Sequence, residues 1–316
     1  YKIPVFIDEK KDLNQNRIVQ YILSILEIYS SNYSKEAVFN YLKTGFVGTP
    51  YICRVLSDNG YNELAYSLLL NKKCPSWLYP VTMGATTIWE RWNSVLPDGR
   101  VNPTDMNSLN HYAYGSVVEW MYRYMAGLNP VEDVPGFRYI NLTPMPDYRF
   151  KYVNSSYNSP VGLYESSWSI KENGELNFKF NIPFNATANL VLPDAKLEEV
   201  YVNGRLLKDT ELIAIVKDEN VVIELVSGVY EFKYNPTKSY IRFYNTSMSL
   251  DELLSHEEVG KLVKDNSQAV VDLMGGMGKS LSYKSMRELN HMPFFHTSEE
   301  EMDLIDEIIG NIKIEA

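Results

Sequence analysis

Cysteine, histidine and positive charge are all scarce in this sequence, and each scarcity argues against a class of protein. Two cysteines, Cys53 and Cys74, cannot build the disulfide framework of a small secreted domain, so we expect both to be reduced thiols. The four histidines show no metal-ligand spacing, and we expect neither a metal nor another cofactor. With 30 basic against 40 acidic residues the net charge is −10. The sequence has no basic stripe of the kind that binds nucleic acid, so we expect no nucleic-acid partner.

Long apolar runs and an export signal are also missing. No hydrophobic stretch is long enough to span a bilayer, so we expect no membrane partner. The segment from Tyr1 to Asp8 lacks the successive charged, apolar and small-residue regions of a signal peptide, and the chain does not start with methionine. We therefore expect a cytoplasmic protein whose natural N-terminus lies before Tyr1.

The first part of the chain, from about residue 14 to residue 128, shows helical periodicity. Apolar residues recur at three- and four-residue spacing, and the breaks between them hold helix start and stop residues. We predict helices that carry Ile18 to Tyr29, Ala37 to Leu42, Tyr51 to Leu56, which starts at Thr49-Pro50, Leu64 to Leu69, and His111 to Met125. Residues 1–130 are therefore predicted to be one helical domain.

Strand-like alternation replaces this pattern between residues 137 and 234. Turn signals such as Glu172-Asn173-Gly174 and Val202-Asn203-Gly204 separate short apolar runs at regular spacing, which is typical of a β-sandwich. We predict an antiparallel β-sandwich over residues 131–236, with strands at Ser167 to Ile170, Leu176 to Ile182, Ala188 to Leu192, Glu199 to Val202, Leu212 to Ile215, Val221 to Leu225 and Tyr230 to Tyr234.

A helical tail is predicted for residues 237–316. Ser249 with Glu252, and Thr297 with Glu300, have the spacing of capping boxes at helix starts. The glycine-rich segment from Gly275 to Ser280 resembles a phosphate-binding loop, but Leu273 occupies the position where that motif needs its first glycine. We interpret this segment as a link between helices.

One stretch, Gly84 to Trp92, has the composition of a sugar-cleaving site. Glu90 lies next to Arg91 and between the indoles Trp89 and Trp92. A carboxylate can move protons, and indole faces cover the apolar side of a sugar ring. The same residues also suit a buried ion pair with two tryptophans in a core, so the residues alone leave both interpretations open.

Three further motifs accompany this stretch in a fixed order: Thr44 to Pro50, Pro75 to Tyr79, and Met106 to Gly115, which reads Met-Asn-Ser-Leu-Asn-His-Tyr-Ala-Tyr-Gly. Together they resemble the bacterial α-L-rhamnosidases of glycoside hydrolase family 78, over roughly residues 10–235. The resemblance implies a partial (α/α)6 toroid followed by an antiparallel β-sandwich and a helical tail. It does not extend to the tail after Thr237.

The resemblance also implies an activity and a set of site residues. Members of this family hydrolyse terminal α-L-rhamnosides with inversion, so the substrate would be a rhamnose-containing glycoside. Glu90 matches the position of the general base, and His111, 21 residues later, matches a residue that contacts the rhamnose. Trp89 and Trp92 would shape the pocket, and Arg91 would orient the glutamate or balance its charge.

The chain departs from the family at the general acid, which belongs to an acidic motif upstream of Thr44. Asp8, Glu9 and Asp12 lack that motif's context, and about five helices precede Pro130 where the family has twelve. One hypothesis is therefore a rhamnosidase piece that carries the base without the acid and needs a missing N-terminal segment or associates with itself. The alternative is a non-catalytic module that binds carbohydrate or serves assembly.

Overall fold

The computed structural model describes residues 45–276, 281–282 and 284–314. The chain divides into two compact units, Tyr1–Val117 and Val118–Ala316. The predicted helices before Gly45, the acidic residues near the start of the chain and most of the glycine-rich link lie outside the described residues. The predicted boundaries at residues 130 and 236 stay predictions.

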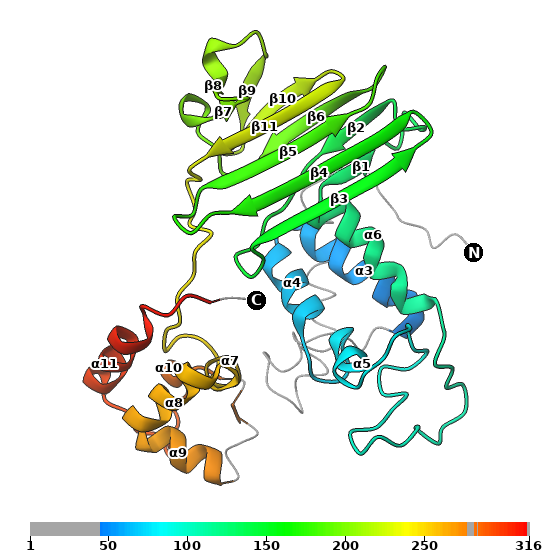
Figure 1. Ribbon diagram of the computed structural model, residues 1–316. Coiled ribbons are helices and arrows are strands. Elements are labelled where there is room, and N and C mark those ends of the chain that lie inside the picture. The colour runs from blue at the N-terminus through cyan, green and yellow to red at the C-terminus, as the bar shows by residue number, and fades with distance from the viewer. Residues whose placement is uncertain (1–44, 277–280, 283, 315–316) are drawn as a thin grey trace, which may run out of the picture. The chain divides into compact units, whose positions relative to one another are not determined.

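The first unit is built on a pair of helices, α3 (Gly45–Asp58) and α4 (Asn62–Leu70) (Figure 1). The apolar face of α3, with Ile52, Cys53 and Leu56, is buried, and so are four residues of α4, because both helices are apolar at helical spacing. A tight turn at Gly60, where φ is +83°, joins them. A short helix, α5 (Leu78–Thr82), follows.

The predicted start of the first helix of this pair is wrong by one turn. The helix begins at Gly45, and Pro50 lies inside it. The Thr49 hydroxyl donates to the Gly45 carbonyl oxygen over 2.6 Å, the bond that a threonine inside a helix makes to the residue four positions earlier. Thr49 therefore lies within the helix, where the sequence indicated a cap before it.

The single helix predicted from His111 to Met125 is three short helices of different winding. A 3-10 helix, η1 (Ala113–Ser116), leads into α6 (Val117–Trp120), and a π-helical turn, η2 (Met121–Met125), ends the run. The apolar stripe predicted for one long helix does bury Tyr114, Val117 and Met125. Periodicity over this window cannot distinguish the three windings, since all of them repeat every three to five residues.

A β-sandwich forms the first part of the second unit (Figure 1). One sheet has the strand order β1-β2-β6-β10-β9, and the other β3-β4-β5-β11-β7-β8. All neighbouring strands are antiparallel except β2 and β6, which run parallel. The strands are β1 (Leu128–Pro130), β2 (Tyr139–Leu142), β3 (Tyr152–Ser159), β4 (Gly162–Ile170), β5 (Leu176–Ile182), β6 (Thr187–Leu192), β7 (Tyr201–Val202), β8 (Arg205–Leu206), β9 (Ala214–Lys217), β10 (Asn220–Leu225) and β11 (Gly228–Tyr234).

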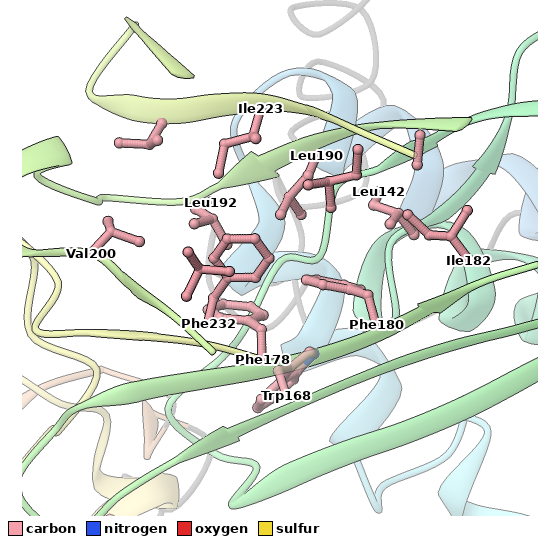
Figure 2. Packing of buried hydrophobic residues seen from close by; sticks show 14 of the residues in the cluster. Leu142, Trp168, Phe178, Phe180, Ile182, Leu190, Leu192, Val200, Ile223 and Phe232 are labelled. Carbon is pink, nitrogen blue, oxygen red and sulfur yellow. The ribbon is translucent and has the colours of Figure 1, made fainter. Parts of the chain in front are cut away.

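The sandwich core lies between the two sheets (Figure 2). Alternate residues of β5 point inward, so that Leu176, Phe178, Phe180 and Ile182 are buried between more exposed neighbours, as period-two patterning requires. The predicted strand from Glu199 is shorter than expected, since Leu197–Glu199 forms a 3-10 helix, η3, before β7. A second such turn, η4 (Leu207–Asp209), follows β8.

The tail forms its own helical core after the sandwich. Its helices are α7 (Leu250–Ser255), α8 (Glu257–Asn266), α9 (Gln268–Gly275), α10 (Met286–Leu289) and α11 (Glu299–Ile309). Ser249 is the N-cap of α7, and its side chain accepts from the Glu252 amide, which is the serine half of the predicted capping box. The capping box of α11 uses Ser298 and Glu301, one residue later than the predicted pair Thr297 and Glu300, because Thr297 is buried and its amide donates to Asn290. Within the described residues, no helix has the length and apolar character to cross a membrane.

Gly127, directly before β1, is the glycine whose replacement we expect to be most disruptive. Its φ is +78°, and an added Cβ would come within 2.2 Å of the backbone nitrogen of Pro144. We expect Gly127→Ala to lower the free energy of unfolding by more than about 1 kcal/mol, measured by urea unfolding, because strain and a backbone clash act together. Gly136→Ala is the control, since its φ is also positive but nothing lies within 4 Å. Equal losses for both variants would contradict the clash.

Candidate functional site

Two irregular segments of the first unit bring the predicted base and the predicted sugar-contacting histidine into neighbouring positions. The backbone N–H of His111 donates to the Ile88 carbonyl oxygen over 2.8 Å, and the Glu90 N–H donates to the Ser108 carbonyl oxygen over 2.9 Å. The Thr87 hydroxyl also donates to the Leu109 carbonyl oxygen. Residues 87–90 therefore lie beside residues 108–111, although about 20 residues separate them in sequence.

The Glu90 side chain is buried, with 9% of its surface exposed, and it is held by the main chain. Its Oε2 atom accepts a hydrogen bond of 2.7 Å from the backbone N–H of Ser108. Because the Glu90 N–H donates back to Ser108, two hydrogen bonds join the same two residues. Charge-assisted bonds of this kind are short and directional, so the carboxylate has a defined position.

Arg91 contacts the following loop. Its Nε atom donates to the Met106 carbonyl oxygen over 3.1 Å. In the described part of the chain, no ion pair joins Arg91 to Glu90, so the predicted orienting role would have to act without direct contact. The Arg91 N–H also bonds to the hydroxyl of Ser94, which is buried where the loop begins.

The loop from Asn93 to Ser108 is ordered by its own hydrogen bonds. Val95 and Val101 form an isolated β-bridge, and the Leu96 N–H donates to the Arg100 carbonyl oxygen over 2.8 Å. Near the end of the loop, the Asn107 amide group donates to the Asn102 carbonyl oxygen over 2.9 Å. The Ser108 amide that bonds to Glu90 therefore belongs to a loop that is held by its own hydrogen bonds.

Aromatic rings pack around the motif as the sequence indicated, but the pocket that they line is not centred on Glu90. Trp92 stacks on Tyr114 with 3.7 Å between ring centroids, and Trp77 meets Trp92 edge-on at 5.6 Å. The Trp77 indole N–H donates to the Tyr114 carbonyl oxygen. A pocket of about 350 Å³ results, lined by Trp77, Pro80, Val81, Ala85, Thr86, Thr87, Ile88, Trp89, Trp92 and Tyr114.

His111 is the middle ring of a three-ring stack. Phe46 lies on one side with its centroid 5.0 Å away and an interplanar angle of 16°, and Tyr112 lies 5.1 Å away at 13°. The His111 Nδ1 atom accepts from the Ala113 N–H over 3.3 Å. Because Nδ1 accepts here, Nε2 is the ring nitrogen that can donate to a ligand.

Phe46 and Tyr112 were not singled out as site residues from the sequence. Both belong to the motifs that carry the family resemblance, which was the available signal. The packing of Phe46 on His111 is a contact across 65 residues, which no local pattern encodes. Tyr112 is 87% exposed, whereas Tyr114 is buried, and burial raises the pKa of the Tyr114 phenol.

Comparison with known proteins assigns the two parts of this arrangement to one family. Residues 33–125 match the bacterial α-L-rhamnosidase six-hairpin glycosidase domain, and residues 127–206 match the C-terminal domain of bacterial α-L-rhamnosidases. A helical-hairpin glycosidase domain followed by β-sheets is therefore the class of fold. The matched residues belong to the bacterial α-L-rhamnosidase family.

Individual relatives agree with this assignment. An α-L-rhamnosidase of Formosa agariphila is 39% identical over 196 residues, which are 61% of this chain and 21% of that protein. An α-L-rhamnosidase of Streptomyces avermitilis is 36% identical over 198 residues, or 62% of this chain and 18% of that protein. The crystal structure of a Streptomyces avermitilis α-L-rhamnosidase complexed with L-rhamnose superimposes with a TM-score of 0.57, covering 63% of this chain and 18% of that one.

The chain thus spans about a fifth of the length of the relatives that it matches. The described part of the first unit contains α3, α4, α5 and η1, fewer helices than six hairpins require. No group of three or more histidine, cysteine or acidic side chains in the described part could hold a metal ion. Cys53 and Cys74 are free thiols.

Proposed function

We propose that this chain carries the general-base half of an inverting α-L-rhamnosidase. The observation that supports it most is the buried Glu90 carboxylate, held by the Ser108 amide beside the segment that presents His111. An inverting hydrolase needs one carboxylate that activates a water and a second, about 6.5–9.5 Å away, that protonates the leaving group. Glu90 takes the first role, and His111 donates from Nε2 to a hydroxyl of the rhamnose.

The same proposal assigns the general acid to residues outside this sequence. The relatives are about five times longer than the stretch of this chain that matches them. The family resemblance places the general acid before the matched motifs. Exposed apolar side chains in the first unit, such as Val47, Tyr51 and Val81, support a partner segment or self-association. The free thiols suit the cytoplasmic location that we propose.

A leaving-group series tests this division of roles with the 316-residue chain. The fluoride ion leaves α-L-rhamnosyl fluoride without being protonated, whereas the alcohol of an alkyl α-L-rhamnoside leaves only with a proton from a general acid. We expect the chain to hydrolyse the rhamnosyl fluoride with inversion and to leave the alkyl rhamnoside intact. Proton NMR of the released sugar shows its anomeric configuration. Turnover of the alkyl rhamnoside would contradict the missing acid. Absence of turnover for both substrates would favour the alternative, a non-catalytic module.

A further inference from the structure

The outer face of the six-stranded sheet has a groove that the proposed catalytic function does not use. Its cavity is about 510 Å³ and lies over four strands, β3, β4, β5 and β11, with Gly204 of the β7–β8 turn at one end. Polar residues on an outer sheet face are ordinary in a sandwich. A hollow of this volume among them is a feature that patterning alone does not require.

The strand register arranges the groove's outward side chains as a grid of two rows. Tyr152 pairs with Ser169, Ser169 with Asn177, and Asn177 with Lys233. Two residues further along the strands, the second row holds Asn154, Ser167, Lys179 and Glu231, and all eight residues line the cavity. With strands about 4.8 Å apart, each row is about 14 Å long, and the rows lie about 7 Å apart.

The charges of the grid are largely satisfied within the sheet. The Lys179 ammonium pairs with Glu231 over 3.2 Å, and the Lys233 ammonium lies over the ring of Tyr201, 5.5 Å from its centroid. Glu175 accepts from the Asn177 amide group over 2.9 Å. A ligand of high charge would have to break these contacts. The groove complements an uncharged molecule that makes many hydrogen bonds.

Tyr152 gives one end of the groove a flat apolar surface, since 63% of its surface is exposed. An exposed ring beside hydroxyl and amide groups matches a sugar, which has an apolar ring face and a polar rim. From the neutral grid, its length and this ring, we propose that the outer face of the sheet binds a neutral oligosaccharide. The choice of rhamnose as the sugar of this oligosaccharide rests on the proposed function. The proposal that the groove binds a neutral oligosaccharide does not rest on it.

Affinity electrophoresis of the full chain through a gel that contains a neutral α-L-rhamnan tests the proposal. We expect the rhamnan to slow migration, and we expect Tyr152→Ala to weaken binding about 3- to 10-fold, with Tyr152→Phe restoring it. Phe184→Ala removes an exposed ring outside the groove and should bind as the parent chain does. Thermal melting of each variant shows whether it is folded, and Asn177→Ala provides a second test on the next-but-one strand.

Three outcomes would overturn the proposal: no retardation by the rhamnan, equal retardation of the parent and both groove variants, or retardation by polygalacturonate alone that disappears at high salt. The last outcome would show simple ionic attraction. The two proposals can fail separately. Retardation by the rhamnan that Tyr152→Ala weakens supports the groove whether or not the chain hydrolyses rhamnosyl fluoride, and turnover of the fluoride without retardation supports only the catalytic proposal.

Discussion

Replacing Glu90 by glutamine should lower the rate of α-L-rhamnosyl fluoride hydrolysis by about 10²–10⁴-fold, the usual contribution of a general base. Glutamine has nearly the same shape and can still accept from the Ser108 amide, so the hydrogen bond at Glu90 Oε2 is retained. Only the ability to take a proton from water is lost. Steady-state kinetics measured by fluoride release gives the ratio, and an unchanged melting temperature shows that the fold is intact.

Two controls separate loss of the base from loss of the site. Asp105→Asn removes an exposed carboxylate from the neighbouring loop and should leave the rate within about twofold, since surface carboxylates contribute little. Azide needs no base, so it should restore turnover of Glu90→Gln and give the rhamnosyl azide of inverted configuration. A rate for Glu90→Gln close to that of the parent chain would show that Glu90 is structural, which is the alternative that the residues alone left open.

The largest stability effect is expected at Phe180, in the middle of β5. Its side chain is fully buried, it lies in the core between the sheets (Figure 2), and its ring centroid is 6.3 Å from that of Phe232. Truncation to alanine removes the whole phenyl ring and leaves a cavity that the packed sheets cannot fill completely. We expect Phe180→Ala to lower the free energy of unfolding by about 3–5 kcal/mol, measured by urea unfolding of the sandwich strands with circular dichroism.

Phe184 provides the matched control, four residues further along the chain. It is 80% exposed in the connection between β5 and β6, so its replacement by alanine should change stability by less than about 0.5 kcal/mol. Similar losses at Phe180 and Phe184 would mean that burial does not explain the stability of this sheet. A small loss at both positions would mean that the core readjusts to fill the space.

The parts of the fold that the sequence predicted are those in which one chain segment carries a complete signal. Leu176 to Ile182 alternates over seven residues and is a strand with those bounds. β3 was missed because its inward side chains include Ser155, whose hydroxyl bonds to the Ser166 carbonyl oxygen of the next strand. β1 and β2 were missed because they are three and four residues long. In these strands, partners elsewhere in the chain decide the conformation.

The candidate site divides in the same way. Glu90 and His111 are readable as motif positions, and the structure places their segments side by side. The role of the Ser108 amide is not readable, because a backbone group has no identity in a sequence. The stack of Phe46 on His111 is a tertiary contact, and the Arg91 contact with Met106 depends on how the loop turns. The chemical types of the site's side chains are thus predictable from the sequence, but the directions in which these side chains point are not.

The paired hydrogen bonds between Glu90 and Ser108 also bear on how such a site can diversify. One contributor is a main-chain amide, which every residue except proline supplies. Mutational drift at position 108 can therefore change the local side chain without displacing the carboxylate. Two of the aromatic rings of the neighbouring pocket, Trp77 and Tyr114, come from other segments and can vary separately. An architecture of this kind lets the side chain at position 108 change over evolution while the position of the Glu90 carboxylate is retained.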